Sequence, residues 1–352
     1  MNNMNKLKDQ KAPRIWQYDL LKTYACFLVV WGHAIVNLTS SDCLDNPLYR
    51  FIYSFHMSLF MMISGFFSSS VKKLDLVSFI KKKFMQLLYP CFIWGMVLFI
   101  LMYGYGFFCD GSSNFTFSQL LSDFYWYSDF WFLKSCFICF CFAFLGMKYC
   151  DKLWIWGPGT LLLSQFVIVF QVPFMYPSFF IGILLRRYNS LMISLIKYRY
   201  IIWSLFVLMS LLWTKEIWIG CHGFSLEIYD NPSKSLIFLF ILRLYRMVIG
   251  VFGALSFIIL FRMIDRPLDS LQIIRNICNY GQYTLEIYVI HSVLFVYVAC
   301  RFLTLDGLSF FQYNFFVTPI ISVIVIFLCN YIIHMLRKKD LLFYLFFGRT
   351  CK

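Results

Sequence analysis

Residues 236–261 read LIFLFILRLYRMVIGVFGALSFIILF, an apolar run of 26 residues in which Arg243 and Arg246 are the only charged side chains. A helix of this length extends about 39 Å, whereas the hydrocarbon core of a bilayer is about 30 Å thick. Similar runs recur from one end of the chain to the other. Because they are continuous rather than alternating, they favour membrane-spanning helices over a barrel.

The composition agrees with this interpretation. Of the 352 residues, 61% are hydrophobic and only 14% are charged, whereas an average soluble domain has about 25% charged residues. A soluble fold of this composition would lack polar surface. We therefore predict an all-α polytopic integral membrane bundle that forms one transmembrane domain over residues 1–352. About ten helices are expected, at residues 15–38, 49–70, 85–108, 129–148, 153–170, 174–188, 200–219, 236–261, 282–301 and 315–336.

The net charge of +14 is explained by the placement of the basic residues. If the N-terminus faces the cytoplasm, 23 of the 31 Lys and Arg fall on predicted cytoplasmic segments. This asymmetry is the usual one in membrane proteins. It predicts a multi-pass protein of the inner (cytoplasmic) membrane, with residues 1–14 and 337–352 in the cytoplasm. The bilayer, and not nucleic acid, is its expected large partner.

The first predicted helix carries Asp19, Lys22 and His33. A charged side chain near the centre of a bilayer costs about 2.5–3.5 kcal/mol on insertion scales, so each one implies a partner, a wet cavity or a function. Lys22 and His33 are eleven residues apart, so they share one helix face and lie about 16 Å apart along the axis.

Further ionisable residues fall in the second, eighth and ninth predicted helices, namely His56, Arg246, Glu286 and His291. Any one intramembrane His is as readily a hydrogen-bonded structural residue as a catalyst. Their concentration in four helices is what structural roles explain poorly, and it predicts a polar interior cavity. Glu286 is a candidate partner of Arg246 or of Lys22. Ser64 and Gly65, at the end of the second helix, offer a small-residue surface for close helix contact.

Several segments resemble the bacterial membrane acyltransferases of type 3. YDLLKTYACFLVVWGHAI (18–35) resembles their first helix, which typically places an Arg and a His eleven residues apart; here Lys22 stands at the Arg position. SFHMSLFMMISGFF (54–67) resembles the second helix of a branch of fucose or exopolysaccharide O-acetylases, with Ser58 in place of the usual Pro. YSDFWFL (127–133), LYRMVIGVFGAL (244–255) and GQYTLEIYVIH (281–291) resemble later helices, in the family's order.

The resemblance implies an enzyme that transfers an acyl group, usually acetyl, from acyl-coenzyme A to a hydroxyl of a cell-surface or lipid-linked glycan. Asp19, Lys22 and Arg246 are the expected donor-binding residues, and no metal is expected. His33 is expected to act either as general base on the acceptor hydroxyl or as the carrier of the acyl group. His56, Glu286 and His291 are expected to complete the catalytic site by orienting the imidazole or the acceptor.

Two alternatives stay open. A proton-coupled transporter or a glycan flippase would also concentrate His, Glu and Arg in a helix bundle, although paired broken helices would then be expected.

Longer relatives append an esterase-like extracytoplasmic domain, whereas this chain stops soon after the tenth predicted span. It is therefore expected to act alone or with a separate extracytoplasmic partner.

Overall fold

The structure, a computed structural model, describes residues 15–109, 130–150, 152–167, 169–218, 234–264 and 271–350, without the side chains of residues 102–109 and 273. All regular secondary structure in these residues is helical, which confirms the predicted fold class. The helices of the first half are α1 (Trp16–Asn37), α2 (Pro47–Phe66), α3 (Leu76–Lys83), α4 (Tyr89–Cys109), α6 (Trp131–Tyr149) and α7 (Leu153–Gln165). Those of the second half are α8 (Val172–Arg187), α9 (Asn189–Lys197), α10 (Arg199–Leu212), α12 (Leu236–Arg262), α13 (Gln272–Tyr280), α14 (Thr284–His291), α15 (Phe310–Gln312), α16 (Thr318–Arg337) and α17 (Asp340–Phe347).

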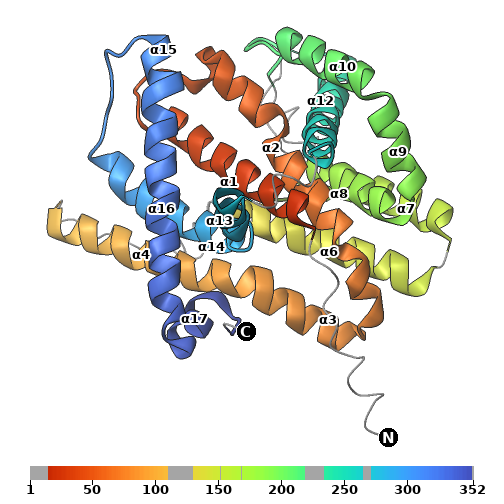
Figure 1. Ribbon diagram of the computed structural model, residues 1–352, viewed down its shortest axis with the longest axis horizontal. Helices are drawn as coiled ribbons and strands as arrows, with labels where there is room; N and C mark the ends of the chain where they lie inside the picture. The colour runs from red at the N-terminus through yellow and green to blue at the C-terminus, as the bar shows by residue number, and fades with distance from the viewer. Residues whose placement is uncertain are drawn as a thin grey trace, which may run out of the picture.

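Helix α2 lies among the other helices and packs against α1, α6, α8 and α12 (Figure 1). Glycines allow this close packing. A Cβ at Gly65 of α2 would collide with the carbonyl oxygen of Phe179 in α8, and one at Gly250 of α12 would lie 2.6 Å from the hydroxyl of Ser58. Small residues let helix backbones approach closely in membrane proteins. The close contact predicted for Gly65 is therefore confirmed, with α8 as its partner.

The start of α2 follows from its sequence. The side chain of Asn46 accepts hydrogen bonds from the backbone N–H groups of Leu48 and Tyr49, and Pro47 occupies the first helical position. Asn is a favoured N-cap, and Pro at the first position has no N–H that would need a partner. Asn46 also donates to the side chain of Asn314 at 2.8 Å, so this cap ties α2 to the π-helical turn before α16.

The ends of the described helices lie at two opposite ends of the bundle. At the basic end, α1 begins, α2, α6, α8, α12 and α16 end, and α17 packs against α4. At the opposite end, the backbone N–H of Leu305 donates to the carbonyl of Leu38, and Arg50 donates to the carbonyl of Trp213 at 3.2 Å. Lys and Arg residues follow the helix ends at the basic end, in agreement with the charge pattern of the sequence.

The span count differs from the sequence prediction. Among the described residues, six helices are long and apolar enough to cross a membrane, or seven if the pair α8 and α9, bent by 104°, counts as one span. Helices α7 and α10, at the predicted fifth and seventh spans, have 13 and 14 residues. Straight helices of that length extend about 20 Å, less than the hydrocarbon core. The positive-inside pattern also predicts outward-facing loops at residues 109–128 and 220–235, which lie almost wholly outside the described residues.

The contact between α2 and α8 generates a test. We expect Gly65→Ala to lower the free energy of unfolding by about 1–3 kcal/mol, because the added methyl overpacks a backbone contact. Gly159→Ala in α7 is the matched control, since nothing lies within 4 Å of a Cβ there and Ala is the better helix former by about 1 kcal/mol. Thermal unfolding in detergent measures both. Equal stability of the two variants would contradict the close packing.

Candidate functional site

A cavity of about 500 Å³ opens at the basic end between α1, α2, α6, α14 and the end of the chain. We call it the central cavity. Residues of α1 at regular helical spacing form one wall, because Asp19, Lys22, Cys26 and Val29 all line it. His33 follows Val29 by four residues on the same helix face. The predicted stripe from Lys22 to His33 therefore runs along the cavity and continues just beyond it.

The charges of this cavity are mostly positive. Lys22 lies 3.4 Å from the carboxylate of Asp19, and its amino group sits 4.7 Å from the centre of the Phe67 ring. Lys82 also lines the cavity. Lys83 is 7% exposed, and its amino group donates to Gln86 at 3.1 Å and lies over the Phe140 ring. With Arg349, four cations and the single carboxylate of Asp19 line the cavity, among the residues that the structure describes.

Glu286 is fully buried beside the cavity and pairs with the guanidinium of Arg349. Arg349 reaches it because α17 ends at Gly348, whose φ of 64° lies in the left-handed region. A Cβ at Gly348 would also lie 2.5 Å from the carbonyl oxygen of Met85. Glycine is the residue that adopts this conformation without a steric penalty. The ionic partner of Glu286 is therefore Arg349, rather than the Arg246 or Lys22 considered from the sequence.

Three of the five histidines meet beyond the inner end of the cavity. The rings of His33 and His291 lie 5.3 Å apart, and His33 also interacts electrostatically with His56. Tyr288, which lines the cavity, lies 5.8 Å from the ring of His291. Met57, the residue after His56, lines the cavity too. The structure therefore brings the three predicted histidines together, next to residues that line the central cavity.

Two of these imidazoles have a defined proton position. Nδ1 of His56 lies 2.8 Å from the carbonyl oxygen of Ile52, and Nδ1 of His291 lies 2.9 Å from that of Ile287. A carbonyl oxygen accepts only, so each Nδ1 carries the proton and Nε2 of the neutral ring keeps its lone pair. Nε2 of His291 is buried and has no hydrogen-bond partner within the described part of the chain. It can accept a proton or a hydrogen bond from a ligand.

Arg246 takes a different place from the other predicted donor-binding residues. It does not line the central cavity. Its guanidinium donates to the carbonyl of Tyr53 at 3.1 Å and lies over the rings of Trp218 and Trp213, 4.5 and 5.2 Å from their centres. It therefore lies in the half of the bundle toward the opposite end, one turn of α2 beyond His56, and apart from Asp19 and Lys22.

A second cavity of about 390 Å³, the polar pocket, lies at the opposite end. Ile35 of α1 lines it, so His33 lies between the residues of α1 that line the two cavities, Val29 and Ile35. The polar pocket contains Asp306, which accepts hydrogen bonds from the backbone N–H of Ser40 and the hydroxyls of Thr39 and Ser40. These bonds lower the pKa of Asp306 below its usual value, so its carboxylate is charged at neutral pH.

The wall of the polar pocket also contains Asp42 and Asp45, both of which pair with Lys215, at 2.7 and 2.8 Å. The hydrogen bond with Lys215 lowers the pKa of Asp42. Among the described residues, no group of three or more His, Cys, Asp or Glu side chains is placed to hold a metal ion. The polar pocket is thus lined by hydroxyls, amides and carboxylates, the groups that hydrogen-bond to polar ligands.

One residue of this site escaped the sequence analysis. From the sequence alone, Arg349 is one of several basic residues in the predicted cytoplasmic tail, residues 337–352. The apolar run DLLFYLFF (340–347) followed by Gly348 is a recognisable helix with its C-terminal glycine. Nothing in the sequence says that the turn after it points back into the bundle.

A known protein family matches most of the chain. The acyltransferase domain that defines the acyltransferase 3 family matches residues 15–335. The matched region contains His33, His56, His291, Lys22 and Glu286. Arg349 lies beyond it. No significant match is found among curated proteins or solved structures.

The pair of Glu286 and Arg349 generates a double-variant test. Arg349→Gln leaves a carboxylate buried without its ionic partner, which is strongly destabilising, and Glu286→Gln removes that carboxylate. We expect the double variant to be more stable than the sum of the single effects predicts, with a coupling energy of about 1–3 kcal/mol. Thermal unfolding in detergent gives the four values.

Lys338→Gln combined with Glu286→Gln is the control, because Lys338 is an exposed residue of the same tail. This control should give additive effects. Additivity for Arg349 as well would contradict the ion pair.

Proposed function

Because the chain belongs to the acyltransferase 3 family, we propose that it transfers an acetyl or other short acyl group from acyl-coenzyme A to a hydroxyl of a cell-surface or lipid-linked glycan. The observation that carries the proposal is the position of His33. It lies on α1 between Val29, which lines the cation-lined cavity at one end of the bundle, and Ile35, which lines the polar pocket at the other. The family match favours an acyltransferase over the transporter or flippase that the sequence leaves open.

The central cavity is the proposed donor site. Coenzyme A is a polyanion, and Lys22, Lys82 and Arg349 supply positive charge where a ligand enters from the basic end. Cations at a concave site favour phosphates electrostatically and by charge-assisted hydrogen bonds. By the positive-inside rule the basic end faces the cytoplasm, where acyl-coenzyme A is made. The acyl arm then extends past Cys26 and Val29 toward His33.

The acceptor is proposed to enter from the polar pocket. The hydroxyls, amides and carboxylates there suit the many hydroxyl groups of a sugar. Donor and acceptor would therefore meet from opposite sides of the membrane, with the histidines between them. Such an arrangement supports an acceptor outside the cytoplasm. It does not require a metal, because proton transfer by an imidazole suffices for attack on a thioester.

The proposed step is a direct transfer. His33 takes the proton of the acceptor hydroxyl as its oxygen attacks the thioester carbonyl carbon. The carbon–sulfur bond breaks, and the coenzyme leaves as a thiolate that takes the proton back from the imidazolium. His291, whose Nδ1 is fixed by the carbonyl of Ile287, orients His33 or the acceptor through Nε2. The alternative is that the His33 nitrogen attacks first and carries the acyl group to the hydroxyl.

We expect His33→Ala to lower the rate of acyl transfer by about 10²–10⁴-fold, the usual contribution of a general base, while the protein still folds. His56→Ala and His291→Ala should lower it less, because they position groups rather than take the proton. The measurement is transfer of radiolabelled acetyl from acetyl-coenzyme A to membrane glycan by purified protein in vesicles. His334→Ala, on the exposed side of α16, is the control. Near wild-type transfer by His33→Ala would remove His33 from catalysis.

Lys22 gives the second test. Lys22→Met removes the charge at similar length and should weaken binding of acetyl-coenzyme A by about tenfold or more, since a charge-assisted contact contributes about 1.5–3 kcal/mol. Turnover at saturating donor should change little, because Lys22 lies about 16 Å from His33 along the helix. Lys22→Arg, which keeps the charge, should retain most of the affinity.

Lys22→Met also removes the ionic contact between Lys22 and Asp19, so Lys22→Met with Asp19→Asn serves as the folding control. If isothermal titration finds unchanged donor affinity in both variants, Lys22 is a structural residue and not a donor ligand.

A further inference from the structure

A third cavity, of about 260 Å³, lies at the basic end on the other side of the last residues of α2 and the segment that follows them. We call it the side pocket. Residues 64–70 separate it from the central cavity: Ser64, Phe67 and Ser70 line the central cavity, whereas Gly65, Ser68 and Ser69 line the side pocket. The remaining walls come from the ends of α6 and α8 and the start of α7. It is therefore distinct from the proposed donor site.

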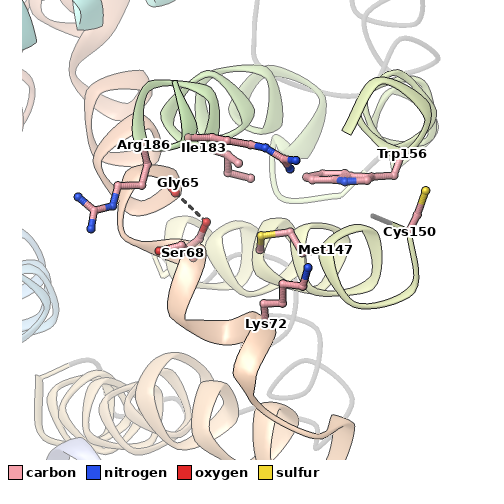
Figure 2. A pocket seen from close by; sticks show the side chains of 10 residues that line it. Gly65, Ser68, Lys72, Met147, Cys150, Trp156, Ile183 and Arg186 are labelled. Carbon is pink, nitrogen blue, oxygen red and sulfur yellow. Dashed lines mark hydrogen bonds between the residues drawn. The ribbon is translucent and has the colours of Figure 1, made fainter. Parts of the chain in front are cut away.

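The polar part of the side pocket is cationic. Lys72, Arg186 and Arg187 line it, and none of its ten lining residues, all of them described, is acidic. Figure 2 shows the amino group of Lys72 below Trp156 and beside Met147, while the guanidinium of Arg186 points away from them and lies over the Phe66 ring, 5.4 Å from its centre. Ser68 donates to the carbonyl of Gly65 at 2.7 Å, which fixes the turn. Lys and Arg side chains around a small cavity are a recognition site for phosphate.

The remaining walls are apolar and adjoin the lipid-facing surface. Met147, Trp156 and Ile183 line the cavity and are buried. Beside them, Tyr149 and Trp154 are 70% and 72% exposed. In a membrane-spanning protein, large aromatic side chains exposed at a helix end mark the boundary between hydrocarbon and headgroups. A ligand with a phosphate in the side pocket would thus have its apolar part beside lipid rather than water.

We propose that the side pocket binds the headgroup phosphate of an anionic phospholipid. Cavities that enclose whole drug-sized ligands measure about 300–1,000 Å³, so the side pocket holds a headgroup and leaves the acyl chains on the surface of α6 and α7. Basic pockets between helices at the cytoplasmic side are the usual form of such sites. A bound headgroup would contact Ser69 and Lys72 and so stabilise the segment that also walls the central cavity.

The test uses delipidated full-length protein in neutral detergent, with lipid binding followed by native mass spectrometry and by thermal stabilisation. Phosphatidylglycerol should bind and raise the unfolding temperature more than phosphatidylcholine. Lys72→Gln with Arg187→Gln should weaken phosphatidylglycerol binding by about tenfold or more, since each cation near an anionic headgroup strengthens its binding. Lys338→Gln with Lys339→Gln removes the same charge elsewhere at the basic end and should change binding by less than about twofold.

Three outcomes would overturn the proposal: equal binding of the two lipids, unchanged affinity in the side-pocket variant, and an equal loss in the control variant. Inorganic phosphate and adenosine diphosphate are included as soluble probes. Stabilisation by either one to the extent given by phosphatidylglycerol would assign the pocket to a soluble phosphate instead. Because the readout is lipid binding, failure here leaves the acyl-transfer proposal untouched, and failure of acyl transfer leaves this one untouched.

Discussion

The energetic penalty for a charged side chain away from water constrains this structure more than any other interaction. In hydrocarbon, such a group needs a partner or a wet cavity, and the charged residues of the candidate site have partners. Lys22 pairs with Asp19, the buried Glu286 pairs with Arg349, and Arg246 lies on a carbonyl and two indole rings. These requirements draw α1, α2, α14 and the chain end together around one cavity. The polar residues of the interior thus form the candidate site.

Close backbone approaches hold that interior in place. Gly65 and Gly250 let α8 and α12 reach α2, and Gly348 turns the chain so that Arg349 enters the cavity. With its neighbours this close, α2 has little freedom to shift. His56 is therefore fixed near His33, and His33 stays between the cavities at the two ends. The close helix contacts at these glycines thus constrain the positions of the histidines.

The sequence predicts the parts of this arrangement that depend on one helix, and misses those that depend on several. The eleven-residue offset between Lys22 and His33 places both on one face without further information. The meeting of His33 with His291 needs the packing of α1 against α14, which periodicity does not encode. The predicted count of ten spans is not confirmed among the described residues, partly because hydropathy registers the apolar character of α7 and α10 but not that each ends after about four turns. Arg349 was missed because its role depends on a turn that folds the tail back.

We propose that acyl-coenzyme A enters from the basic end and places its thioester at the histidines. The most direct measurement is a cryo-electron microscopy structure of the protein in lipid nanodiscs with a non-hydrolysable acetyl-coenzyme A analogue. We expect the phosphates near Lys22, Lys82 and Arg349, with the acyl arm running along α1 past Val29 to His33. Density for the analogue in the side pocket or the polar pocket, with the central cavity empty, would contradict it.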